Sequence, residues 1–169
     1  MLNITPLGWI HTVLGLIAVV AGFAALIAHR QIDMASRPGR MFFWFTVATA
    51  VTGLFIFRHG GFGVPHVLSL LTLAVLALAW FGERRGARGG FWRYVAVVSY
   101  LLALFFHFIP GFTETLIRVP IGDPWASGIE DPRLRQPIGA AFVVFLVAAV
   151  WQVLRVRKRS PRSVGAGLT

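Results

Sequence analysis

The stretch LGWIHTVLGLIAVVAGFAALIA, residues 7–28, decides the fold class of this chain. It contains no Asp, Glu, Lys or Arg, and its single titratable side chain is His11. A helix crosses a hydrocarbon core of ~30 Å with about 17 to 25 residues of this kind. Because lipid offers the backbone no hydrogen-bond partners, such a segment crosses as a helix and not as a strand. The stretch therefore predicts a transmembrane helix.

The rest of the chain has the same apolar character. Of its 169 residues, 57% are hydrophobic and 13% are charged, and the mean hydropathy is +0.74, which is far from the balance of a soluble domain. Four further segments are long and apolar enough to cross a membrane: residues 41–57, 64–81, 91–109 and 138–154. The sequence predicts an all-α integral membrane protein with five transmembrane helices. We expect the first four to form an up-and-down bundle and the fifth to pack alongside.

The positions of Lys and Arg predict the orientation of these helices. Twelve fall on one side of the predicted membrane: Arg30, Arg37, Arg40, Arg84, Arg85, Arg88, Arg93, Arg155, Arg157, Lys158, Arg159 and Arg162. The other side holds four: Arg58, Arg118, Arg133 and Arg135. Because cytoplasmic connections carry the excess of basic residues, the N-terminus is predicted outside and the C-terminus inside, in a cytoplasmic membrane. The tryptophans agree, since they fall at predicted helix ends or in a connection, where their rings meet the headgroups.

We predict one transmembrane domain, residues 1–159, followed by a disordered cytoplasmic tail, residues 160–169. The outer connection at residues 111–137 is the longest, and it holds four of the six acidic residues. Connections of this length are usually functional or disordered. Its first part, TETLIR, could form a helical turn in which Glu114 and Arg118 pair at i, i+4. The connection could then lie over the outer mouth of the bundle.

Several function classes are excluded or disfavoured. The absence of cysteine removes disulfides, thiolate metal sites, iron–sulfur clusters and c-type haem attachment. The net charge of +10 is explained by membrane topology, with no need for nucleic acid. The GGFG turn at residues 60–63 does not match a phosphate-binding loop. No nucleophile and base stand at recognisable spacing, so an enzymatic activity stays open without support.

Four of the five histidines are predicted to lie at one level near the outer face. Three are in or at the ends of spans, His11, His66 and His107, and His59 follows the second span. At a rise of ~1.5 Å per residue, the four differ by roughly 10 Å in depth. Ionisable groups within a span are energetically costly and usually face the bundle interior. We therefore expect His11, His66 and His107 to form a functional site.

One face of the first helix consists of small residues between two histidines. Its members repeat at intervals of four and three: His11, Gly15, Ala18, Gly22, Ala25 and His29. Such a face allows close helix packing, and it also leaves room for a flat cofactor beside an axial ligand, so Gly15 is a candidate cofactor contact. His29, next to Arg30, is interpreted as a flanking residue of the inner side.

The predicted histidine cluster suits three kinds of chemistry. Imidazoles together with Glu114 suit a metal ion such as zinc, iron, manganese or oxidised copper, with His59 as a further candidate ligand. A single b-type haem requires two facing histidines, His11 or His66 with His107. A proton relay is the third. We expect metal or haem binding for redox or metal handling, with a possible redox or membrane-protein partner. The alternative is a non-catalytic accessory subunit whose histidines only make interhelical hydrogen bonds.

The chain resembles a family of bacterial multi-pass proteins known only as predicted membrane proteins, a domain of unknown function. The resemblance covers roughly the first half of the chain, in HTVLGLIAVVAGFAAL, RPGRMFFWFTVATAVTGLFIF and PHVLSLLTLAVLAL. It implies a multi-pass fold and no defined activity. The family pattern has a histidine before the arginine of the inner turn, where this chain has Ser36 before Arg37. The histidine placement is also similar to that of small four-helix membrane b-type cytochromes, which implies haem as a hypothesis.

Overall fold

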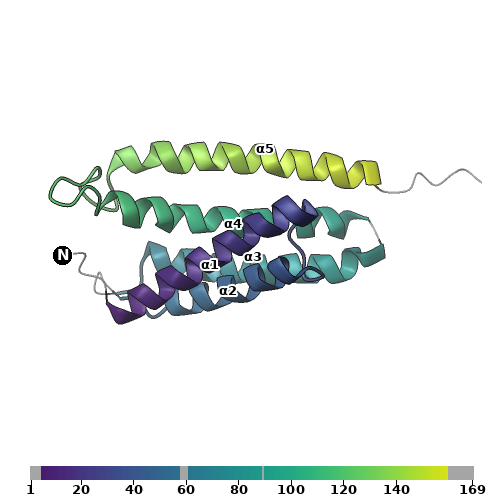
Figure 1. The fold of residues 1–169 in the computed structure, drawn as a ribbon, viewed down its shortest axis with the longest axis horizontal. Coiled ribbons are helices and arrows are strands. Elements are labelled where there is room, and N and C mark those ends of the chain that lie inside the picture. Colours follow the sequence, from purple (N-terminus) through teal and green to yellow (C-terminus); the bar gives the residue numbers. More distant parts are fainter. Residues whose placement is uncertain (1–4, 58–60, 89, 160–169) are drawn as a thin grey trace, which may run out of the picture.

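A computed structural model describes residues 5–57, 61–88 and 90–159, and within them every regular element is helical (Figure 1). The five α-helices are α1 (Pro6–His29), α2 (Arg37–Gly53), α3 (Val64–Arg85), α4 (Phe91–Leu116) and α5 (Arg135–Arg159). Two short 3₁₀ helices are η1 (Gly86–Arg88) and η2 (Pro132–Leu134). The predicted all-α fold is confirmed. His59 and the predicted tail, residues 160–169, lie outside the described residues.

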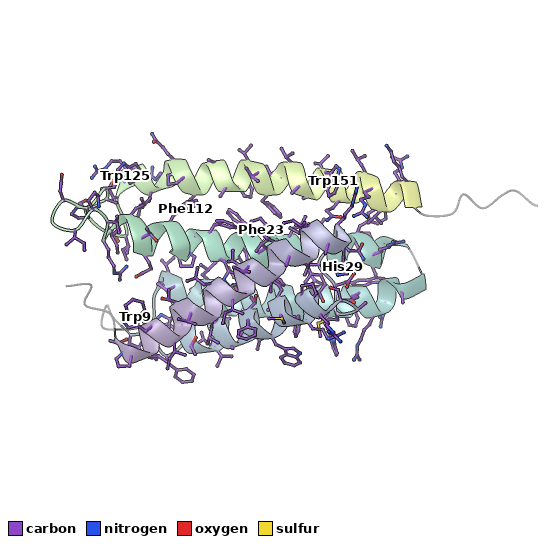
Figure 2. The ribbon with its side chains drawn as sticks, in the orientation of Figure 1. Trp9, Phe23, His29, Phe112, Trp125 and Trp151 are labelled. Atoms are coloured by element: carbon purple, nitrogen blue, oxygen red, sulfur yellow. The ribbon has the colours of Figure 1, made fainter. Side chains whose placement is uncertain are left out.

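Successive α-helices run in opposite directions (Figure 1). α1 to α4 form the bundle, in which α2 packs between α1 and α3, and α5 packs along α4. We call the end with the start of α1 and residues 117–131 the long-loop end, and the opposite end, with Arg30, Arg84 and Arg155, the basic end. Trp9 and Trp125 lie at the long-loop end and Trp151 at the basic end (Figure 2).

Within the described residues, four helices are long and apolar enough to cross a membrane. These spans are Pro6–His29, Val64–Arg85, Phe91–Leu116 and Pro132–Lys158. The remaining predicted span, residues 41–57, is not among these four, because its helix α2 has 17 residues and ends at Gly53. At ~1.5 Å per residue this is about 26 Å of helix, slightly less than a hydrocarbon core. The chain is therefore a multi-pass membrane protein with four clear candidate spans and one shorter helix between them.

α1 and α2 each begin at a side-chain cap that the local sequence supplies. The Thr5 hydroxyl accepts a hydrogen bond from the Gly8 N–H at 3.1 Å, and the Ser36 hydroxyl accepts one from the Gly39 N–H at 3.1 Å. Both caps precede a proline near the first helical position, where its missing N–H costs nothing. These local signals determine where α1 and α2 begin.

The small-residue face of α1 packs into the bundle as predicted, except at its last member. Ala18 and Ala25 are fully buried, and Gly22 is buried. A Cβ on Gly22 would stand 3.0 Å from the Phe42 ring and 3.1 Å from Leu104, so its absence allows α1 to approach both side chains. His29 is exposed at the end of α1.

α4 extends beyond its predicted end at residue 109. It continues through Pro110 to Leu116, and the connection that follows is correspondingly shorter than predicted. Glu114 and Arg118 form the predicted ion pair. The chain then folds back, because the Ala126 N–H donates to the Leu116 carbonyl at 3.0 Å. The predicted end at residue 109 was wrong, since a helix tolerates a proline such as Pro110 when other groups satisfy the freed backbone.

Candidate functional site

His11 projects from the second turn of α1 onto α2. Its Nδ1 lies 3.1 Å from the Thr52 hydroxyl oxygen, and the ring also hydrogen-bonds the backbone at Thr49. The Thr52 hydroxyl donates its own proton to carbonyls of α2, at 2.9 Å from both Ala48 and Thr49 oxygens. Thr52 must therefore accept from His11, so Nδ1 carries the ring proton and Nε2 carries the lone pair.

The His11 ring is also held by the absence of a side chain on α2. A Cβ on Gly53 would stand 3.2 Å from the His11 Cε1 atom and 2.6 Å from the Ser69 hydroxyl of α3. α1, α2 and α3 therefore meet at this glycine, with an imidazole and a hydroxyl on either side of it. Gly53 was predicted to face inward, and it is buried.

His107 projects from α4 onto the same helix, α2. Its Nε2 lies 3.0 Å from the hydroxyl oxygen of Thr46, which is fully buried. In the described part of the chain the Thr46 hydroxyl has no carbonyl acceptor on its own helix, unlike Thr49 and Thr52. Its proton is therefore free to face His107 Nε2. The Phe42 ring packs edge-on against the imidazole, with centroids 6.3 Å apart.

His107 Nδ1 faces Gly15 of α1, one helical turn after His11, and we call His11 and His107 the histidine pair. A Cβ on Gly15 would stand 3.7 Å from His107 Nδ1 and 3.5 Å from the Thr49 methyl group. His11 lies within electrostatic range of both His107 and Glu114. The structure therefore places both histidines against α2 and Gly15 next to His107, whereas Glu114 is linked to His11 only by a charge interaction.

His66 has a different role from the histidine pair. It lies in the first turn of α3, where its Nδ1 accepts a hydrogen bond from the Gly63 N–H at 3.1 Å. The ring is packed between two phenylalanines, with centroid distances of 4.7 Å to Phe57 and 5.1 Å to Phe62. Only 3% of His66 is exposed, and its Nε2 has no hydrogen-bond partner. His66 acts as a helix cap within an aromatic cluster.

The structure does not gather the predicted ligands around one point. Among residues 5–57, 61–88 and 90–159, no three His, Asp or Glu side chains are placed so that they could hold one metal ion. A bis-histidine haem needs two rings that face each other across the porphyrin. Here His107 Nε2 faces Thr46 and the His11 ring packs on Gly53. A single ion therefore suits the histidine pair better than a porphyrin does.

A second polar cluster lies at the basic end, and it was not predicted from the sequence. The Glu83 carboxylate of α3 accepts hydrogen bonds from the Tyr100 hydroxyl at 2.7 Å and from the Met34 N–H at 2.9 and 3.1 Å. Glu83 stands directly before two arginines in the sequence, which is the pattern of a solvated helix end. The signal in the sequence that could have indicated this cluster was an acidic residue directly before two arginines.

The hydroxyl partners of the histidines were found only in part. Thr46 and Thr49 were expected to face inward and are buried. Thr52 and Ser69, which lie beside His11, were not singled out. Both lie on the same helix faces as residues that were predicted to be inward, at spacings of three and four.

Comparison of this chain with protein-family models, with curated proteins and with solved structures finds no match in any of the three.

Proposed function

We propose that the chain crosses a bacterial cytoplasmic membrane five times, with the long-loop end outside. α2 joins the basic end to the long-loop end between two clear spans, which supports its being the fifth crossing. Nine Lys and Arg residues whose side chains are described belong to the basic end: Arg30, Arg37, Arg40, Arg84, Arg85, Arg93, Arg155, Arg157 and Lys158. Because such residues are enriched on the cytoplasmic side, this distribution supports the orientation.

Within this protein, the proposed function is binding of one transition-metal ion, zinc, iron or copper, at the histidine pair, for redox or metal handling. The observation that carries the proposal is the tautomer of His11. Its Nδ1 is held by the Thr52 hydroxyl at 3.1 Å, which leaves the Nε2 lone pair unused by this contact. Metal-binding histidines are commonly oriented in this way, by a hydrogen bond from the other ring nitrogen.

His107 would be the second protein ligand, and Glu114 would join only after its side chain moves, because no three His, Asp or Glu side chains of the described residues are placed to hold one ion. His107 can offer its Nε2 lone pair once the Thr46 hydroxyl turns away from it, and α2 supplies carbonyl acceptors for that hydroxyl. Glu114 lies on α4 seven residues after His107, on the same helix face, and its side chain is half exposed. Two imidazoles and a carboxylate leave a coordination position open, as in reactive metal sites.

A second candidate function is a structural or accessory subunit without a cofactor. The favouring observation is that each histidine of the pair already makes a hydrogen bond between helices, His11 to Thr52 and His107 to Thr46. Polar contacts of this kind hold membrane helices together at about 0.5 to 2 kcal/mol each.

Metal analysis of the detergent-purified full chain tests the proposal. The protein is equilibrated with Zn²⁺, Fe²⁺ or Cu²⁺ in turn, desalted, and measured by elemental analysis and by absorbance. We expect one ion per chain in the wild type, its loss in His11→Gln, and its retention in His29→Gln, the matched control at the exposed end of α1. Thr52→Val should reduce affinity by about 10- to 100-fold through the lost orientation of His11.

Other outcomes separate the remaining candidates. If the wild type retains none of the three metals while His11→Gln and His107→Gln both lower the melting temperature, that result would support the structural function instead. A Soret band in the purified protein would assign the histidines to haem and overturn the ion. Equal metal retention in His11→Gln and His29→Gln would place the metal elsewhere.

A further inference from the structure

An apolar cavity of about 440 Å³ opens between α4, α5 and the long loop. Its lining consists of Phe112, Leu116, Trp125, Gln136, Pro137 and Ala140. Five of these six side chains are apolar or aromatic, and the volume falls within the range of about 300 to 1,000 Å³ of ligand sites. The cavity is distinct from the histidine pair, because neither histidine nor its hydroxyl partner belongs to the lining.

The cavity lies where the membrane surface meets the protein. Phe112 and Leu116 belong to the last turns of the span Phe91–Leu116, whereas Gln136, Pro137 and Ala140 belong to the first turns of the span Pro132–Lys158. Figure 2 shows Phe112 and Trp125 close together at the long-loop end, with Trp125 on the loop beyond the helix ends. Tryptophan prefers the headgroup level. The cavity therefore extends from the headgroups into the hydrocarbon layer.

One cation beside this cavity has no acidic partner. Of the three described arginines at the long-loop end, Arg118 pairs with Glu114, and Arg133 pairs with Asp131 at 2.7 Å. Arg135, adjacent to the lining residue Gln136, is exposed and forms no ion pair with any residue that the structure describes. An apolar cavity whose lining residue Gln136 is next in sequence to an arginine without an ion pair is complementary to one kind of molecule, an acyl chain that carries an anionic phosphate headgroup.

We propose that this cavity binds one acyl chain of an anionic phospholipid, whose phosphate group is bound by Arg135 and the Gln136 amide. Trp125 covers the chain at the headgroup level, and Phe112 and Leu116 contact it deeper in the bilayer. Basic pockets between transmembrane helices select anionic lipids on the same principle. A zwitterionic lipid has the same acyl chain, but the positive charge of its headgroup would lie close to Arg135 and be repelled. The site therefore discriminates by headgroup charge.

Quenching of Trp125 fluorescence by brominated lipids tests this proposal in the reconstituted full chain. Vesicles of phosphatidylcholine contain a minor, equal fraction of either brominated phosphatidylglycerol or brominated phosphatidylcholine. The Trp125 signal is the difference between the wild type and Trp125→Phe. We expect about fivefold preferential quenching by the brominated anionic lipid, the preference that one basic residue at a membrane surface supports.

Two variants separate headgroup recognition from chain binding. Arg135→Gln should remove the preference for the anionic lipid and leave quenching by both lipids equal. Ala140→Phe should fill the cavity and lower the quenching by both, whereas Val144→Phe, one turn further along the exposed face of α5, should change neither. Equal quenching by the two lipids in the wild type, an unchanged preference in Arg135→Gln, or identical behaviour of Ala140→Phe and Val144→Phe would overturn the proposal.

Discussion

Glu83 at the basic end and the histidines at the long-loop end differ in how many of their polar atoms have hydrogen-bond partners. At the basic end, Glu83 accepts hydrogen bonds from Tyr100 and Met34 and thereby joins α3 to α4 and to the turn after α1. At the long-loop end, each histidine of the pair has one hydroxyl partner, and His66 Nε2 has none. A fully partnered carboxylate stabilises the fold. An imidazole with a ring nitrogen that has no hydrogen-bond partner remains available to a ligand.

The same difference appears in how α5 is attached. At the basic end, the Gln152 amide and the Arg155 guanidinium both donate to the Arg30 carbonyl at the end of α1, at 2.7 and 2.6 Å. At the long-loop end, α5 and α4 separate enough to leave the lipid-sized cavity. The basic end therefore links α1, α3, α4 and α5 through hydrogen bonds, although Gln152 Oε1 has no partner among the described residues, and the long-loop end carries the candidate binding sites.

Replacement of Glu83 should have the largest effect on stability. Glu83→Leu leaves the Tyr100 hydroxyl and the Met34 N–H without their acceptor, which costs about 2 to 4 kcal/mol. Thermal unfolding in detergent measures the loss, and Glu130→Leu in the exposed part of the long loop is the matched control. If both variants melt alike, the basic end is not the stabilising end.

A methyl group on Gly53 should have the next largest effect, at the opposite end. Gly53→Ala places a Cβ 2.6 Å from the Ser69 hydroxyl and 3.2 Å from the His11 ring, so α1 and α3 must move apart. We expect a loss of about 1 to 3 kcal/mol together with reduced metal retention. Gly139→Ala, where a Cβ meets nothing within 4 Å, should gain up to ~1 kcal/mol of helix stability instead. Equal melting of the two variants would contradict the close contact.

Replacement of His66 should have a small effect, in contrast to Glu83. His66→Phe keeps a ring between Phe57 and Phe62 and removes the unpartnered Nε2, while it loses the acceptor for the Gly63 N–H. Because these two changes oppose each other, we expect a net shift of less than ~1 kcal/mol in thermal unfolding. A loss as large as that of Glu83→Leu would show that His66 Nε2 has a partner in the membrane.

The smallest effect should be local to the long loop. The Arg133 guanidinium and the Ser127 N–H lower the pKa of Asp131 below its ordinary value of 3.8. The ordering that this carboxylate provides is therefore present above pH 3.8 and is lost as the pH falls through the lowered pKa. Asp131→Asn should increase hydrogen exchange at Ser127 and Arg133 at pH 7 without changing the melting temperature. Asp123→Asn is the control, and equal exchange in both variants would contradict the assignment.

Much of the fold followed from local sequence patterns. Long apolar segments predict helices because every backbone group in lipid must be satisfied within its own segment. The small-residue face at Ala18 and Gly22 and the Glu114–Arg118 pair were predicted from spacing alone, and the predicted start of the first helix at residue 7 is one residue from its start at Pro6. The end of α4 was missed, because Pro110 forbids only one backbone hydrogen bond and the surrounding groups decide whether the helix continues.

The candidate site was predicted less completely, for a physical reason. Depth along a helix follows from residue count, so it could be anticipated that His11 and His107 lie toward the same end of the bundle. The direction of each side chain depends on how its helix rotates against its neighbours, which packing decides. His66 therefore turned out to cap α3, and His11 turned out to share its surroundings with Thr52 and Ser69.

Taken alone, the sequence determined that this chain is helical, that it belongs in a membrane, and where most of its helices begin. These properties depend on hydrophobicity and on backbone hydrogen bonds that close within a few residues. The tertiary structure alone decided that His11 and His107 both contact α2, that Glu83 joins three segments, and that an open cavity forms between α4, α5 and the long loop. Those features require contacts between distant residues, and such contacts depend on helix rotation and close packing, which no local pattern specifies.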